Sequence, residues 1–316
     1  MSGRLLDRRL LFVTGKGGVG KTTVSAALAL LAARSGKQVL VCEVDAKGTL
    51  GAALEVGPLR FEPTPVESGL VAMAMNTEDS LREYLTLQLK LPLLARIGPL
   101  ARMLDFVASA APGVREILTV GKPTWEVREQ HYDLVVVDAV ATGHITGQLA
   151  APQAINELVQ VGIVREQTRW MLDILGDPES TGLVIVTSPE EMPVNETIEL
   201  AARLPRESPV ELAAVVVNRV LPELFGRGEE AVFDQLKGSP AAVTRLREAA
   251  GTGVTTVLAA ADLAVTLRRS RATHLAQLRA ALPPGLPLLY VPELFSRIPG
   301  RRFTAQVAEA LGEELT

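Results

Sequence analysis

The stretch Gly15-Lys16-Gly17-Gly18-Val19-Gly20-Lys21-Thr22-Thr23 follows the apolar run Leu10–Thr14 directly and precedes an alanine-rich helical pattern. It fits G-x-x-x-x-G-K-[ST] in the strand–loop–helix setting that this pattern requires. The glycines let successive backbone N–H groups turn toward a phosphate, and the following helix adds its positive N-terminal end. We expect Lys21 to reach the β- and γ-phosphates and the Thr22 hydroxyl to ligate Mg²⁺. A bare glycine-rich turn explains neither residue, so the sequence predicts a site for a nucleoside triphosphate.

Short apolar runs alternate with longer helical patterns along the chain, which is typical of a parallel sheet with crossover helices. Several runs are continuously apolar, as strands covered on both faces are. We therefore expect an α/β fold: a doubly wound, mostly parallel sheet of about seven to eight strands, in a single domain over residues 1–316. The expected strands are Leu10–Thr14, Gln38–Asp45, Leu70–Met75, Leu134–Asp138, Leu183–Thr187, Leu212–Asn218 and Pro287–Val291. The expected helices are Thr22–Ser35, Val194–Leu204, Pro240–Ala250, Ser270–Ala281 and Ala305–Leu315.

Two apolar helical excursions, residues 79–127 and 153–175, exceed what a minimal doubly wound sheet needs. One interpretation is an ordinary helical layer packed on the sheet. The other is a helical subdomain with an apolar groove that opens and closes with nucleotide state and binds a partner or client, since large apolar surfaces usually mark interaction sites. The sequence leaves both interpretations open.

Composition narrows the class of protein. A hydrophobic content of 47% with 22% charged residues is typical of a globular chain. Cys42, the one cysteine, lies in an apolar strand, so we expect a core thiol and no disulfide or Cys-x-x-Cys metal pair. The net charge of −4 argues against a nucleic-acid partner. The first nine residues show no apolar leader and no long uncharged apolar stretch follows, so we expect a soluble, cytoplasmic protein.

Lys16, directly after the first glycine of the loop, resembles the signature lysine of the deviant Walker A ATPases. This class holds the nitrogenase iron proteins, the Min and Par ATPases and the arsenite-pump and tail-anchored-protein-targeting ATPases. The resemblance implies that Lys16 crosses a dimer interface to the nucleotide of the facing subunit, where a cation supplied in trans is worth ~10³–10⁵ in rate. The plainer alternative is a solvated loop lysine. We expect a homodimer, or a heterodimer with a related ATPase chain.

The run Leu134–Asp138 ends in a carboxylate, the Walker B pattern, so Asp138 is expected on Mg²⁺ at the carboxyl edge of the sheet. The residues Ala139-Val140-Ala141-Thr142-Gly143-His144 follow it. They resemble the switch II motif D-[TS]-A-P-T-G-H of the arsenite-pump and tail-anchored-protein-targeting family, with matches at Asp138, Thr142, Gly143 and His144. Ala141 replaces the proline that would stiffen the loop. We expect His144 to be a structural switch residue rather than a proton-transfer base, because phosphoryl transfer relies mainly on positioning.

Asp45 matches, by its order along the chain, the switch I aspartate that positions the attacking water in this family. Ala46-Lys47-Gly48 stand where the family has Pro-Ala-His. A carboxylate that accepts a hydrogen bond from water can aim it in line with the γ-phosphate. The expected catalytic residues are therefore Asp45, Lys16 and Lys21. Glu43, on the same strand face, is the alternative to Asp45, and Mg²⁺ ligation is a further role for Asp45.

Two segments are expected at the nucleotide base. Asn218 matches the asparagine that contacts adenine in the family, and an amide offers the donor and acceptor that the N6/N7 edge needs. Val291-Pro292-Glu293-Leu294-Phe295 resembles the family's adenine loop, which implies contacts from Pro292, Glu293 and Phe295. Because Arg219 follows Asn218, the guanine-specific pattern N-K-x-D is absent. The sequence therefore favours ATP over GTP.

The resemblance covers nearly the whole chain and is closest to short, cysteine-poor bacterial members of the family. It implies a Mg²⁺-dependent ATPase that acts as a dimeric switch around a protein or membrane-protein client. Arsenite needs several converging thiolates, so one cysteine argues against arsenite, and against a zinc clasp.

The rival from another class is a partition-type or regulatory ATPase, in which ATP controls assembly and partner recruitment. Glu309, Glu313 and Glu314 in the last helix argue against recruitment to a membrane by a basic amphipathic helix. A third alternative is a non-hydrolysing scaffold. The catalytic and metal-binding candidates that the chain retains argue against it: Lys16, Lys21, Thr22, Asp45 and Asp138.

Overall fold

A twisted β-sheet forms the centre of the molecule. The structure is a computed structural model, and it describes residues 5–44, 48–88, 114–158, 163–223, 225–226, 228–295 and 300–316. Over these residues the sheet has eight strands in the order β3-β4-β2-β5-β1-β6-β7-β8. All neighbouring pairs are parallel except β3 and β4. The strands are β1 (Leu10–Gly15), β2 (Val39–Glu43), β3 (Thr64–Glu67), β4 (Leu70–Ala74), β5 (Leu134–Asp138), β6 (Thr181–Thr187), β7 (Leu212–Val220) and β8 (Leu288–Pro292).

Helices cover both faces of this sheet, which explains why its central strands are continuously apolar. Alternate residues of β1 divide between two cores: Leu11 and Val13 face one, and Leu10 and Phe12 face the other. The first core is closed by α1 (Lys21–Arg34), α2 (Thr49–Leu54) and α12 (Arg301–Leu315). The second is closed by α5 (Val114–Arg128), α6 (Thr142–Leu158), α8 (Glu191–Glu207) and the carboxyl end of α11 (Val254–Ala281).

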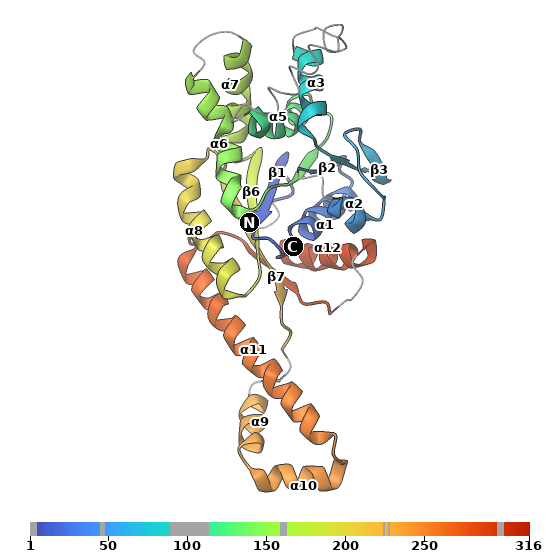
Figure 1. Ribbon diagram of the computed structural model, residues 1–316, viewed down its shortest axis with the longest axis vertical. Helices are drawn as coiled ribbons and strands as arrows, with labels where there is room; N and C mark the ends of the chain where they lie inside the picture. Colours follow the sequence, from blue (N-terminus) through green and yellow to red (C-terminus); the bar gives the residue numbers. More distant parts are fainter. Residues whose placement is uncertain are drawn as a thin grey trace.

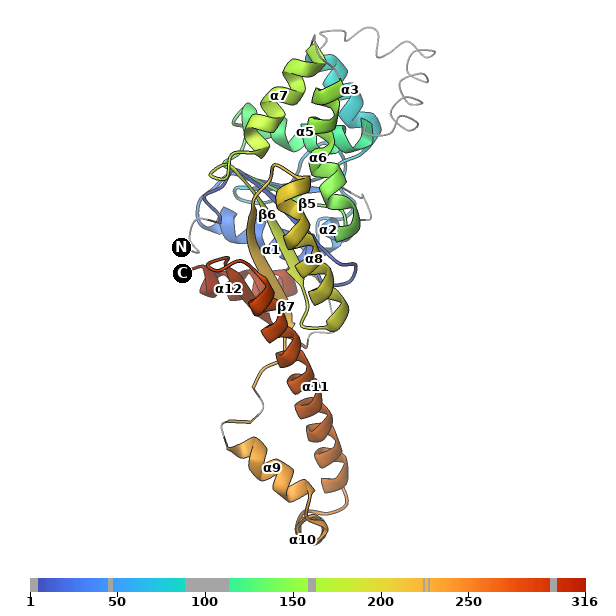
Figure 2. The same cartoon turned by 90° about the vertical axis from the view of Figure 1, so that its left-hand side faces the viewer.

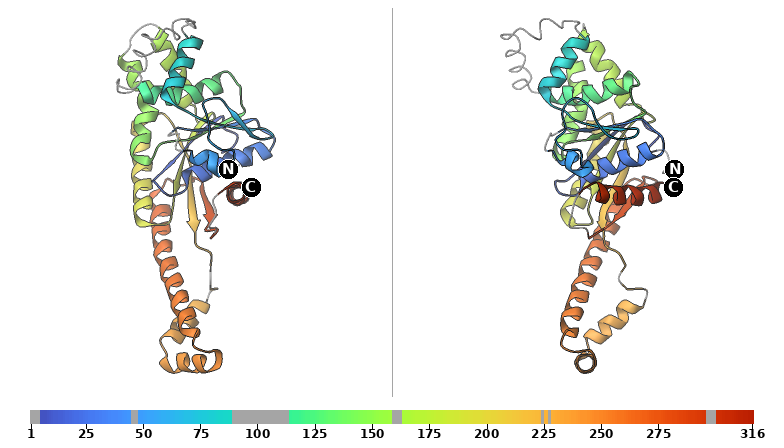
Figure 3. Two further views of the ribbon diagram at one scale, coloured as in Figure 1. Left: turned by 45° about the vertical axis from the view of Figure 1, so that its right-hand side comes forward. Right: turned by 90° about the vertical axis from the view of Figure 1, so that its right-hand side faces the viewer.

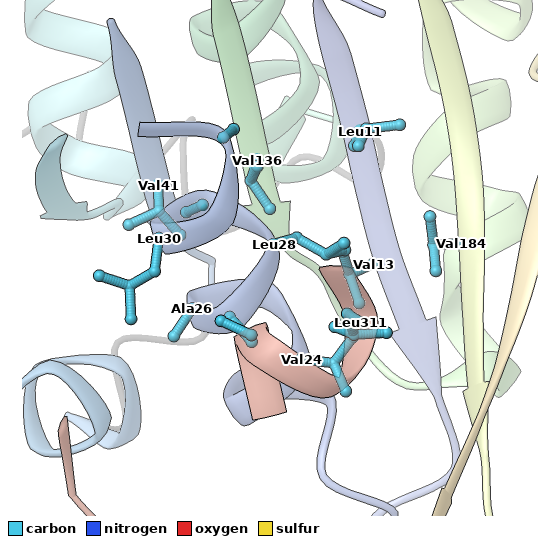
Figure 4. Packing of buried hydrophobic residues seen from close by; sticks show 14 of the residues in the cluster. Leu11, Val13, Val24, Ala26, Leu28, Leu30, Val41, Val136, Val184 and Leu311 are labelled. Atoms are coloured by element: carbon cyan, nitrogen blue, oxygen red, sulfur yellow. The ribbon is translucent and has the colours of Figure 1, made fainter. Parts of the chain in front are cut away.

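Helix α1 lies between the sheet and α12, and is therefore buried on nearly every side. Figure 4 shows Val24 and Leu28 of α1 close to Val13 of β1 and to Leu311 of α12. Leu28 and Leu311 are fully buried. The small alanines of α1 permit this close approach, because they fill little space between two packed layers. The helix that follows the phosphate loop is thus firmly fixed.

The helices α3 (Thr77–Gln88), α5, α6 and α7 (Ile163–Leu175) gather at one end of the molecule, as Figures 1 and 2 show. We call this group the helical lobe. It contains the described residues of the two excursions, 79–127 and 153–175, together with the first part of α6. Residues 89–113 and 159–162 lie outside the described residues. Helix α6 joins the sheet to this lobe, since it packs against both α5 and α7.

A helical arm projects from the opposite end (Figures 1 and 3). It consists of α9 (Glu229–Lys237), α10 (Pro240–Ala250) and the amino-terminal part of α11. Arg269 of α11 forms two ion pairs with α9. Its Nε lies 2.5 Å from Oε1 of Glu230, and its Nη2 lies 2.7 Å from Oδ2 of Asp234. The carboxyl end of α11 returns to the body, where Leu278 is fully buried.

The predicted α/β fold with a mostly parallel sheet is confirmed, and each predicted strand has a counterpart within a few residues. Strand β3 was not predicted, because Pro65 and its polar neighbours are typical of a sheet edge rather than of a core strand. The prediction for the helix Ser270–Ala281 was too short: α11 begins at Val254. Within the described part of the chain, no helix is long and apolar enough to cross a membrane.

Candidate nucleotide site

The phosphate loop joins β1 to α1 at the carboxyl edge of the sheet. A Cβ on Gly15 would lie 2.1 Å from the backbone oxygen of Val186 on β6, so only glycine fits there. Gly20, before α1, has a φ of +97°, and a Cβ on it would lie 2.4 Å from Nδ2 of Asn218. Glycine is required at both positions by close packing and, at Gly20, by left-handed backbone. The loop is thus held tightly against β6 and β7.

The amino end of α1 has the features of an anion site. No side chain caps it, and its first turn contains no acidic residue. Gly17 and Gly18 are exposed beside it. Nζ of Lys21 lies 3.3 Å from the backbone oxygen of Lys16, so the amino group folds over the loop. Backbone N–H groups, the helix dipole and one ammonium therefore converge where a phosphate would bind.

Thr22 and Asp138, the two predicted Mg²⁺ residues that the structure describes, lie together. The Thr22 hydroxyl donates to Oδ2 of Asp138 at 2.7 Å, and the Ser25 hydroxyl lies 3.1 Å from Oδ1. Mg²⁺ prefers hard oxygen ligands and keeps several waters, so one hydroxyl and one carboxylate beside bound phosphates fit this ion. The chemistry of the donors therefore agrees with the predicted metal site.

Burial makes Asp138, which is only 7% exposed, a weaker acid. Burial raises its pKa from an ordinary value near 3.8 to about 6, and the negative charge of Glu43 acts in the same direction. Hydrogen bonds from Thr22 and Ser25 and the charge of Lys21 oppose the rise. The negative charge of this carboxylate is therefore only partly stabilised by its neighbours, and a bound cation would stabilise it further.

Glu43, the alternative to Asp45, is occupied as a helix cap. It is 2% exposed and ends β2 beside Asp138. Its oxygens accept hydrogen bonds from the backbone N of Gly48 at 3.2 Å, and from the backbone N and hydroxyl of Thr49 at 2.9 and 2.6 Å. These bonds secure the start of α2. Asp45, Ala46 and Lys47 lie outside the described residues, so the roles expected of Asp45 stay predictions.

The segment predicted to form switch II leads directly from Asp138 into α6. The Thr14 hydroxyl donates to the backbone oxygen of Val140 at 2.7 Å, which ties this segment to β1. Thr142, the first residue of α6, is buried, and its hydroxyl donates to Oε2 of Glu196 at 2.7 Å. Gly143 and His144 are exposed in the first turn of α6. Asp138 and Thr142 of the motif are therefore buried, whereas Gly143 and His144 face the surface.

Lys16 forms an ion pair within its own chain, through Nζ and Oε1 of Glu196 on α8. Both side chains are about one third exposed, at 29% and 31%. Partial burial acts to raise the pKa of Glu196, but the hydrogen bonds from Lys16 and Thr142 outweigh it and lower the pKa. Sequence reasoning missed Glu196. No motif marks it, and only the adjacency of β1, β5 and β6 brings it to the loop.

The residues expected at the base lie at the ends of β7 and β8. Asn218 donates from Nδ2 to the backbone oxygen of Val19 at 2.8 Å, so it braces the phosphate loop. The backbone N of Glu293 donates to the oxygen of Val220 at 2.8 Å, which places Pro292 and Glu293 beside β7. Phe295 is 69% exposed. An adenine contact from these residues stays a prediction.

Cys42 lies in the sheet core that the helices α5, α6 and α8 close. It is fully buried, and burial raises the pKa of its thiol far above the usual range. A thiol in this state is neither nucleophilic nor a ready metal ligand. Its position agrees with the expected core role.

Comparisons with known proteins find a matching family and several relatives of this chain. A family model described as "Anion-transporting ATPase" matches residues 8–167 and 160–232. "ATPase BagA" of Mycobacterium tuberculosis is 34% identical over 230 residues, which cover 69% of this chain and 67% of that protein. The "ATPase ASNA1 homolog" of Cryptosporidium parvum is 28% identical over 261 residues, 71% and 70% of the two chains. A "Putative arsenical pump-driving ATPase" of Halobacterium salinarum is 27% identical over 257 residues, 74% of this chain and 39% of that one.

Proposed function

Because this chain belongs to the anion-transporting ATPase family, we propose that it is a Mg²⁺-dependent ATPase that works as a dimeric switch. ATP turnover would drive an open and closed change around a protein or membrane-protein client. The loop Gly15–Thr23 holds the phosphates, and Thr22 and Asp138 hold Mg²⁺. Asn218, Pro292, Glu293 and Phe295 face the adenine.

The observation that carries the proposal is the position of α6. Its first residue, Thr142, lies in switch II, four residues after the Mg²⁺ candidate Asp138. Its other end packs against α5 and α7 of the helical lobe (Figure 1). A packed helix moves as a rigid element, so a shift of switch II is transmitted to the lobe. Nucleotide state and client binding are thereby coupled through one helix.

The reaction requires little covalent chemistry from the protein. Water attacks the γ-phosphorus in line with the leaving β-phosphate oxygen, and Asp45 accepts a hydrogen bond from that water and aims it. Lys21 and the loop N–H groups hold the β- and γ-phosphates. Lys16 of the facing subunit neutralises charge on the leaving oxygen. Bound Mg²⁺ supplies further charge neutralisation at the phosphate oxygens.

Dimerisation is supported by the surface around the loop. Gly17 and Gly18 are exposed, and the Lys16 side chain is accessible from outside. A cation at the rim of its own site is in position to serve a neighbouring subunit. A homodimer and a heterodimer with a related chain both satisfy this geometry.

The partition-type rival receives no comparable support from the last helix. Val307, Ala308 and Leu311 of α12 are buried against α1 and the sheet. The apolar face that a membrane-recruiting helix would present is therefore already covered.

Hydrolysis assays and light scattering on three proteins test the proposal. We expect the wild type to hydrolyse ATP with Mg²⁺ and to double its mass when ATP binds. Lys21→Ala should lose ATP binding, since it removes the phosphate-holding ammonium. Asp45→Asn should keep MgATP binding and lose turnover, because water is no longer aimed.

The outcomes separate the roles of Asp45 from one another. Loss of Mg²⁺ retention together with turnover in Asp45→Asn would show a metal ligand instead of a water-positioning residue. A wild type that neither hydrolyses ATP nor changes mass would contradict the proposed function.

A further inference from the structure

Three elements of the nucleotide site meet at one carboxylate, that of Glu196. The phosphate loop contributes Lys16, whose Nζ pairs with Oε1. Switch II contributes Thr142, whose hydroxyl donates to Oε2 at 2.7 Å. Glu196 itself lies on α8, which follows β6 at the same sheet edge. Each carboxylate oxygen therefore has one partner, and each partner comes from a different functional segment.

We propose that Glu196 is a positioning residue that holds Lys16 in its own subunit until ATP binding moves switch II. The inference rests on the proposed function, in which Lys16 serves the nucleotide of the facing subunit. Lys16 has one ammonium, so it pairs either with Glu196 or with phosphate oxygens across the interface. The pair with Glu196 thus competes directly with assembly of the active dimer.

The exposure of the pair makes this competition reversible. A fully buried pair is costly to break, because it leaves an uncompensated charge in the interior. Lys16 and Glu196 are about one third exposed, so water replaces each partner when they separate. Such pairs contribute modestly to stability. The contact is therefore strong enough to orient Lys16 and weak enough to release it.

The shared carboxylate links the release to switch II. Thr142 is the first residue of α6, and its hydroxyl bond fixes the orientation of Glu196. A displacement of the start of α6 removes that bond and leaves the carboxylate with a single partner. Glu196 then has freedom to rotate, and the ion pair with Lys16 loses its fixed geometry. Movement of switch II thereby frees the lysine that completes the neighbouring site.

The test compares Glu196→Gln with Glu199→Gln, a matched control exposed on the same helix. Light scattering in an Asp45→Asn background measures the ATP concentration that gives half-maximal dimer. We expect Glu196→Gln to lower this concentration about two- to fivefold, as loss of a partly exposed ion pair would. Glu199→Gln should leave it unchanged. In chains with Asp45 intact, the turnover number at saturating ATP should stay within about twofold of wild type, because Glu196 has left Lys16 in the closed dimer.

A double variant separates positioning from a structural role. In a Lys16→Ala background, Glu196→Gln should have no further effect on dimer formation, since the competing ammonium is gone. An equal effect in both backgrounds would overturn the inference. So would a Glu196→Gln protein that dimerises like wild type, or one whose turnover number falls while dimerisation is unchanged.

The same measurements separate this inference from the proposed function. A wild type that dimerises with ATP beside an unaltered Glu196→Gln protein overturns the inference alone. A wild type that stays monomeric with ATP contradicts the proposed function, and the inference with it.

Discussion

At the scale of single residues, the site sacrifices stability for function, and Asp138 shows this most clearly. Its carboxylate is buried beside Glu43, and two hydroxyl donors do not fully compensate its charge. An amide side chain at this position would keep an acceptor for these hydroxyls without the cost of a buried charge. Under the proposed function, this unfavourable charge is retained because Mg²⁺ binding needs it.

The raised pKa of Asp138 predicts a pH dependence of folding. Its folded-state pKa of about 6 lies above the ordinary value near 3.8. The group therefore contributes stability that is fully present below about pH 4 and is lost as the pH rises through 6, on the order of 3 kcal/mol at pH 8. Asp138→Asn should accordingly raise the free energy of unfolding of the nucleotide-free protein at pH 8, measured by chemical denaturation. A loss of stability in this variant would contradict the account.

The same group predicts how Mg²⁺ binding responds to acid. Only the ionised carboxylate binds the ion, so the affinity for Mg²⁺ with ADP should fall about tenfold per pH unit below pH 6. Calorimetry across pH 5–8 measures it. Asp138→Asn provides the control, because it keeps the titration of the ADP phosphate, whose second pKa is about 6, and loses that of the carboxylate, so its affinity should fall less steeply with acid than that of the wild type. A wild-type affinity that is constant between pH 5 and 7 would rule out Asp138 as the titrating ligand.

At the scale of elements, the sequence predicts the sheet better than the helices. Runs such as Leu134–Asp138 are buried on both faces, so composition alone identifies them. The edge strand β3 contains Pro65, and α11 begins in a threonine- and alanine-rich segment without an apolar stripe, so neither boundary has a local signal. The loop Gly15–Thr23 and Asp138 were predictable because a motif marks them. Glu196 was not, because its role depends on strand order.

The last helix provides a test of packing at this scale. Leu311 of α12 is fully buried against α1, so Leu311→Ala should cost about 2–5 kcal/mol in the free energy of unfolding. Urea denaturation measures the loss. Glu313→Ala, at an exposed site on the same helix, should change it by less than about 0.5 kcal/mol. A loss below about 1 kcal/mol for Leu311→Ala would show that α12 is peripheral and available for another partner.

At the scale of the whole molecule, the carboxyl edge of the sheet, which carries the candidate nucleotide site, lies between two helical extensions. The helical lobe is at one end and the arm at the other (Figures 1 and 2). Helix α11 contains 28 residues, so it is about 42 Å long. Val257 and Leu263 of α11 are mostly exposed on the arm. The lobe is joined to switch II by α6, whereas the arm follows directly from β7, the strand that carries Asn218.

The most direct test of the dimeric switch mixes two inactive variants, Lys16→Ala and Asp45→Asn. In a mixed dimer, the Lys16→Ala subunit keeps its own Asp45 and receives Lys16 from its partner. A 1:1 mixture should therefore recover about a quarter of the wild-type ATPase rate, since half of the dimers are mixed and each has one complete site. If mixed dimers, isolated through two affinity tags, have no more activity than either variant alone, then Lys16 does not act across the interface and the account is wrong.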